Sequence, residues 1–128
     1  MNIDMDRLLA QDMLSLTPKS GSFDLEAVAA GIAGIDYSMR DTHLSERFCV
    51  APDAAWRDEI AAARAADPDY PFPLVCTVEV RPDEVLVWPA SHTPGLAACS
   101  RAVLEWLLGH KECWVENDLG ADMLAPAA

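Results

Sequence analysis

The feature that most constrains the fold is a pair of apolar, β-branched runs separated by a short turn. Residues 74–80 read Leu-Val-Cys-Thr-Val-Glu-Val, and residues 85–88 read Val-Leu-Val-Trp. Between them stands Arg-Pro-Asp-Glu, whose proline and aspartate suit the central positions of a tight turn. Two such runs across a turn predict a β-hairpin, so the chain is expected to contain an antiparallel sheet.

Three helices are predicted around this hairpin. The first covers 22–34, with Ser22 as its N-cap and acidic residues in its first turn, where the helix dipole favours them. The second covers 54–66 after Asp53 as N-cap, in a stretch rich in good helix formers. The third begins with Thr93 as N-cap and Pro94 as its first residue. Each helix carries an apolar stripe that must be buried against other elements.

Short strands are predicted between the helices. They cover 37–40, 47–50 and 112–116, and a first strand is predicted over 13–17. A helix over 5–14 competes with that first strand, because the periodicity of this region does not separate the two. The resulting order is β-α-β-β-α-β followed by β-α-β.

The first six elements match the ferredoxin-like pattern, so we expect an α+β two-layer sandwich. Its helices would lie on one face of a mainly antiparallel sheet. The chain has no linker and no repeat, so residues 1–128 are expected to form one globular domain, with 122–128 as a loose tail.

The charge of the chain excludes some functions. Among its 128 residues, 21 are acidic and 9 are Lys or Arg, giving a net charge of −12. A surface this acidic argues against nucleic-acid binding, which requires cations that displace phosphate counterions. There is no apolar run long enough for a membrane helix and no basic, apolar start typical of a secretion signal. We therefore expect a cytoplasmic protein that binds neither nucleic acid nor membrane.

Histidine and cysteine side chains offer the best set of metal ligands, namely His92, Cys99, His110 and Cys113. Imidazole and thiolate are the ligands that zinc prefers. However, the spacing lacks the close cysteine pair of a zinc finger, and both cysteines fall in apolar runs. Burial of the thiols in the core is therefore the favoured interpretation, and a small metal-binding protein or enzyme is the alternative.

No motif identifies a catalytic residue or a cofactor. A reactive thiol would need a lowered pKa, and Cys99 is the best candidate because it falls in the first turns of a helix. Its position on the apolar stripe argues against that role. Glycine loops that bind phosphate and nucleophilic serine motifs are absent from the sequence.

Partner binding is the function that the sequence favours. Trp88 lies at the end of a predicted strand beside a proline, where partial exposure would make it an interface anchor. Glu79 alternates with apolar residues and suggests that one sheet face is partly wet. An acidic surface accelerates binding of basic proteins. Small immunity or inhibitor proteins of basic nucleases share this size and charge, which is an analogy only. A homodimer through the wet face is a further possibility.

Overall fold

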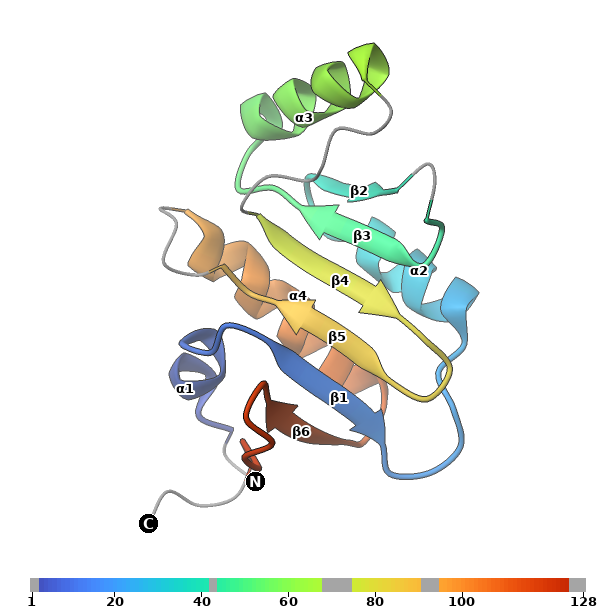
Figure 1. Cartoon of the computed structure of the whole chain (residues 1–128), viewed down its shortest axis with the longest axis vertical. Coiled ribbons are helices and arrows are strands. Elements are labelled where there is room, and N and C mark those ends of the chain that lie inside the picture. Colours follow the sequence, from blue (N-terminus) through green and yellow to red (C-terminus); the bar gives the residue numbers. More distant parts are fainter. Residues whose placement is uncertain (1–2, 42–43, 68–74, 91–94, 125–128) are drawn as a thin grey trace.

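The computed structural model describes residues 3–41, 44–67, 75–90 and 95–124. Over these residues it shows an α+β fold with four helices on a six-stranded antiparallel sheet (Figure 1). In the described part of the chain no helix is long and apolar enough to cross a bilayer. In chain order the elements are α1 (Met5–Leu9), β1 (Leu14–Pro18), α2 (Leu25–Ala33), β2 (Ser38–Arg40), β3 (Arg47–Val50), α3 (Ala54–Ala66), β4 (Cys76–Val80), β5 (Val85–Trp88), α4 (Leu96–His110) and β6 (Cys113–Asn117).

The predicted hairpin is confirmed as β4 and β5. Val80 pairs with Val85, and Arg81 and Glu84 close the turn through backbone hydrogen bonds of 2.8 and 3.3 Å. The hairpin occupies the middle of the sheet, whose strand order is β2-β3-β4-β5-β1-β6. Each of its strands therefore has a hydrogen-bonded neighbouring strand on both sides. Central strands are rich in apolar, β-branched residues, which is why this segment was predicted so clearly from the sequence.

The predicted order of elements is confirmed with one helix, α1, added at the start, but the first six predicted elements do not make up the ferredoxin-like order. That order would place the first strand between the third and fourth strands of the chain, whereas β1 lies between β5 and β6. Helix α4 joins β5 to β6 and leaves the width of one strand between them, which β1 fills. Strands β3 and β4 pair directly with each other instead. The helix between them, α3, has only one buried side chain, Ile60.

The helices do not all cover one face of the sheet, which corrects the expectation that they do. Helices α1, α2 and α4 share the main core with inward residues of the strands, and α2 and α4 lie behind the sheet in Figure 1. Helix α3 lies beyond the edge strand β2 in Figure 1, and its Ile60 belongs to a smaller cluster with Cys49, Val75 and Leu96 of α4. The side chain of Cys49 points away from that of its neighbour Val50, as alternation along a strand requires.

The helix caps confirm one prediction and correct another. Asp53 accepts the amide of Trp56 at 2.9 Å and begins α3 as predicted. Helix α2 begins at Asp24 rather than Ser22, because the Asp24 carboxylate accepts the two amides that follow it by two and three residues. The predicted cap Thr93, with Pro94 and His92, lies outside the described residues. Within the described part, α4 starts after Gly95, whose φ of 84° favours glycine.

The described residues near both ends are more ordered than expected, while 125–128 of the predicted tail lie outside the described part. The competing predictions for residues 5–17 are each partly correct, because a short helix, α1, is followed by the strand β1. The predicted loose tail is wrong for its first residues. Met123 is buried, and its amide donates to the carbonyl of Val115 at 2.8 Å. This return covers the outer edge of β6.

Candidate functional site

The candidate site lies on the face of the sheet opposite α2 and α4 (Figure 1). Across β4, β5, β1 and β6 no described helix covers the strands, and Figure 1 looks onto this side. We call this surface the open face. By the register of the paired strands, its members are Thr77, Glu79, Leu86, Trp88, Ser15, Thr17, Trp114 and Glu116.

Trp114 is the most exposed aromatic side chain of the open face. It lies on β6 opposite Thr17 and is 54% exposed, although a tryptophan usually buries most of its large surface. The ammonium of Lys19 lies 4.3 Å from the centre of the indole ring. This is a cation–π contact, in which the ring face attracts positive charge.

Trp88 also lies on the open face, opposite Thr77, and is half-buried. Leu86, two residues earlier on the same strand, is half-buried as well. Both side chains therefore add apolar surface beside the β1–β6 half of the face. The role of Trp88 in binding a partner stays a prediction.

Glu79 is held inside a network of charges. Its side chain is only 13% exposed, and its carboxylate lies 2.6 Å from the guanidinium of Arg81 and 3.7 Å from that of Arg47. Arg81 also reaches Glu84 at 3.7 Å, and Glu84 accepts the hydroxyl of Ser15 at 2.6 Å. These contacts neutralise Glu79 within the chain, so the predicted partner residue has little free charge to offer.

One rim of the open face is acidic. Where β1 begins and β6 ends, the side-chain amide of Asn117 donates to the side-chain carbonyl of Gln11 at 3.1 Å and so brings the segment around Asp12 beside the turn after β6. Residues 116–124, at this end of β6 and in the turn after it, contain three acidic residues and neither Lys nor Arg. The same turn presents Leu119, which is 87% exposed. The rim therefore combines negative charge with an exposed apolar side chain.

The predicted metal ligands are not gathered at one point. Cys99 and His110 lie eleven residues apart on α4, which at 1.5 Å per residue separates them by about 16 Å. His110 stacks on Trp106 with 4.6 Å between ring centres, and Cys113 is buried in the main core. A metal ion therefore cannot bind Cys99 and His110 together. Among the described residues no three His, Cys, Asp or Glu side chains form a group that could hold a metal ion.

The four cysteines are free thiols with raised pKa values. Burial raises the pKa of Cys49 and that of Cys76 to about 12. Burial also raises the pKa of Cys99, whose thiol lies 3.2 Å from the carbonyl of Leu96 in the first turn of α4. A raised pKa keeps the thiol protonated and unreactive at neutral pH, which is the opposite of what a nucleophile requires.

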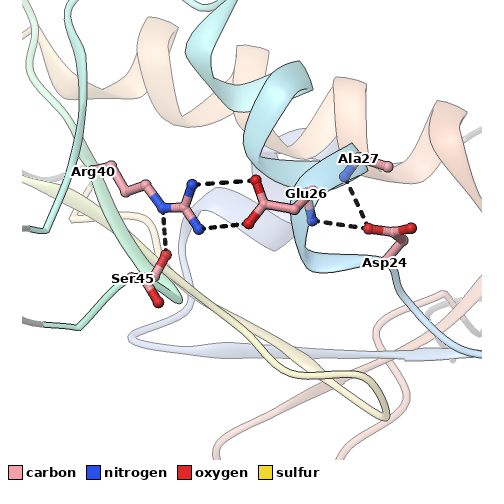
Figure 2. Close-up of polar contacts among 5 residues, drawn as sticks. All are labelled: Asp24, Glu26, Ala27, Arg40 and Ser45. Carbon is pink, nitrogen blue, oxygen red and sulfur yellow. Dashed lines mark hydrogen bonds and ion pairs between the residues drawn. The ribbon is translucent and has the colours of Figure 1, made fainter.

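An ion pair joins the first turn of α2 to the edge strand β2. Figure 2 shows the guanidinium of Arg40 meeting both carboxylate oxygens of Glu26, at 3.0 and 3.5 Å, while its Nε donates to the carbonyl of Ser45 at 2.6 Å. The hydrogen bonds from Arg40 lower the pKa of Glu26. Asp24 caps the same helix end. Arg40 and Glu26 pair with each other and Asp24 accepts backbone amides, which indicates a structural role.

From the sequence, Trp114 was predicted to lie in the last strand. Neither its exposure nor the sheet face on which it lies was predicted. A signal was present, because Trp114 alternates with the buried Cys113 and Val115 and shares its parity with Glu116. Alternation along a strand puts residues of one parity on one face. Trp114 could therefore have been predicted to lie on the same sheet face as Glu116, and so to be exposed.

Comparison of the chain with models of protein families, with curated proteins and with solved structures finds no significant match.

Proposed function

We propose that this chain is a cytoplasmic protein-binding module whose open face binds a basic protein. The observation that carries the proposal is the exposed tryptophan of a sheet face that no described helix covers. Tryptophan is prominent among residues that dominate binding energy at interfaces. The four free thiols fit a reducing compartment.

The size of the open face favours a partner that also contacts its rim. Four strands spaced at about 4.8 Å, each roughly five residues long, present only about 300 Å² in projection. A stable interface buries about 800 Å² on each partner. Contacts must therefore extend beyond the strands, and the rim beside β6 is acidic. A basic protein gains from that rim, whereas a second copy of this chain would place acidic rim against acidic surface.

Capture from a lysate of the cells that make this protein tests the proposal. The tagged chain should retain a basic protein at low salt and release it as salt rises, because screening weakens attraction between exposed charges. Trp114→Ser should abolish the capture. Leu44→Ser is the matched control, because it also replaces an exposed large apolar residue but lies between β2 and β3, at the opposite edge of the sheet from β6.

Two outcomes would contradict the proposal. One is capture that survives Trp114→Ser, since the open face would then not be the binding surface. The other is a chain that captures no protein at either salt concentration while light scattering shows a dimer that Trp114→Ser dissociates. In that case the occupant of the open face is a second copy.

A further inference from the structure

We infer that the ring of Trp114 is the site for a lysine or arginine side chain of the partner, and that Lys19 occupies this site in the free protein. The inference rests on the proposed function, because it names the partner group that the open face recognises. It assigns Lys19 the role of an internal competitor for the partner's cation.

The register shows what surrounds the ring. The amide of Lys19 donates to the carbonyl of Glu112 at 3.0 Å, which extends the β1–β6 ladder by one pair beyond Pro18 and Cys113. Glu112, just before β6, and Glu116, within it, stand two residues on either side of Trp114 and are both exposed. Residues two apart on a strand lie on the same face. The indole therefore lies between two carboxylates, which together attract positive charge.

The position of Lys19 shows that the ring accepts a cation. Within the described part of the chain, its ammonium forms no ion pair with Glu112, although the two residues lie directly across the ladder. It lies over the indole instead. An ammonium that contacts a ring beside an available carboxylate indicates that the ring face is a favourable place for positive charge.

Among the described residues, no Lys or Arg besides Lys19 lies over the ring of Trp114. Six arginines have carboxylate partners of their own within 4 Å, so their charges are committed elsewhere. Arginine also stacks on aromatic faces through its planar guanidinium, which is more weakly hydrated than an ammonium. An arginine of a basic partner is therefore well suited to displace Lys19 from the ring.

A charge-matched pair of variants tests this inference. Lys19→Gln frees the ring, whereas Lys111→Gln removes the same charge from a lysine that contacts no aromatic ring among the described residues. The probe is a fluorescein-labelled hexa-arginine peptide, whose dissociation constant is measured by fluorescence anisotropy at low salt. Loss of the internal contact should make Lys19→Gln bind the peptide about two- to five-fold more tightly than Lys111→Gln.

Trp114→Leu completes the experiment. Combined with Lys19→Gln, it should remove the gain and return the affinity to that of Lys111→Gln. Equal affinities of the two glutamine variants would overturn the role of Lys19, and a gain that persists without the tryptophan would overturn the role of the ring. If either happens while Trp114→Ser still abolishes capture of the basic protein, the proposed function stands and only this inference fails.

Discussion

At Gly31, helix α2 lies directly against the Trp106 ring of α4. A Cβ atom at this position would overlap the indole ring of Trp106, so only glycine fits beside the ring. The ring in turn stacks on His110, one turn further along α4. The close approach of the two helices therefore depends on one missing methyl group.

We expect Gly31→Ala to lower the free energy of unfolding by about 1–3 kcal/mol, because the indole must leave its place in a packed core. Gly109→Ala is the control, since a Cβ atom there meets no atom within 4 Å. That change should stabilise the protein by up to about 1 kcal/mol, because alanine is the better helix former. Urea unfolding followed by circular dichroism measures both. Equal stability of the two variants would show that the helices do not rely on Gly31.

Single residues also show how much of the candidate site could be predicted from the sequence. Glu79 was correctly expected on a partly wet face, because alternation in its strand is a local property. Its pairing with Arg47 was not predictable, since β3 and β4 are joined through a helix and a long connection. The exposed Trp114 could be assigned to a face but not to the open one, because which face a helix covers is decided by packing.

Helix α3 has the fewest buried residues of the four described helices. It has 13 residues but one buried side chain, Ile60, whereas α4 has five buried residues. Its second attachment is the ion pair of Arg64 with Asp41, at 2.9 Å and largely buried. Helices in proteins draw most of their stability from packing rather than from propensity. The alanine-rich sequence predicted this helix correctly but not how weakly it is anchored.

We expect the amides of α3 to exchange with deuterium at least about tenfold faster than those of α4 after correction for intrinsic rates, because weakly packed elements open locally. Hydrogen exchange followed by mass spectrometry measures this. Arg64→Met should accelerate exchange in α3 and leave α4 unchanged, since it removes the ion pair with Asp41. Identical protection of both helices in the unaltered protein would mean that α3 opens only on global unfolding.

At the scale of the whole molecule, negative charge dominates. Ion pairs with arginine neutralise only some of the 21 acidic residues. The other acidic residues give the protein its net charge of −12. The remaining carboxylates repel one another across an exposed surface. Such self-repulsion opposes the compact state.

Added salt should therefore stabilise the fold. We expect the melting temperature to rise by about 4 °C between 10 and 200 mM NaCl, which corresponds to roughly 1 kcal/mol for a domain of this size. Differential scanning calorimetry measures the shift, and choline chloride at the same ionic strength controls for binding of a particular cation. A melting temperature that falls as salt is added would show that attractive charge pairs outweigh the repulsion.

The sequence by itself determined the hairpin, the order of the helices and strands and the acidic surface, because these follow from local periodicity, turn residues and composition. Only the tertiary structure decided that β1 lies between β5 and β6, that α3 lies beyond the edge strand β2, and that Trp114 is exposed beside Lys19. The reason is physical. Strand order and face coverage depend on which apolar surfaces meet across long separations in the chain, and alternation along one strand does not reveal its neighbour.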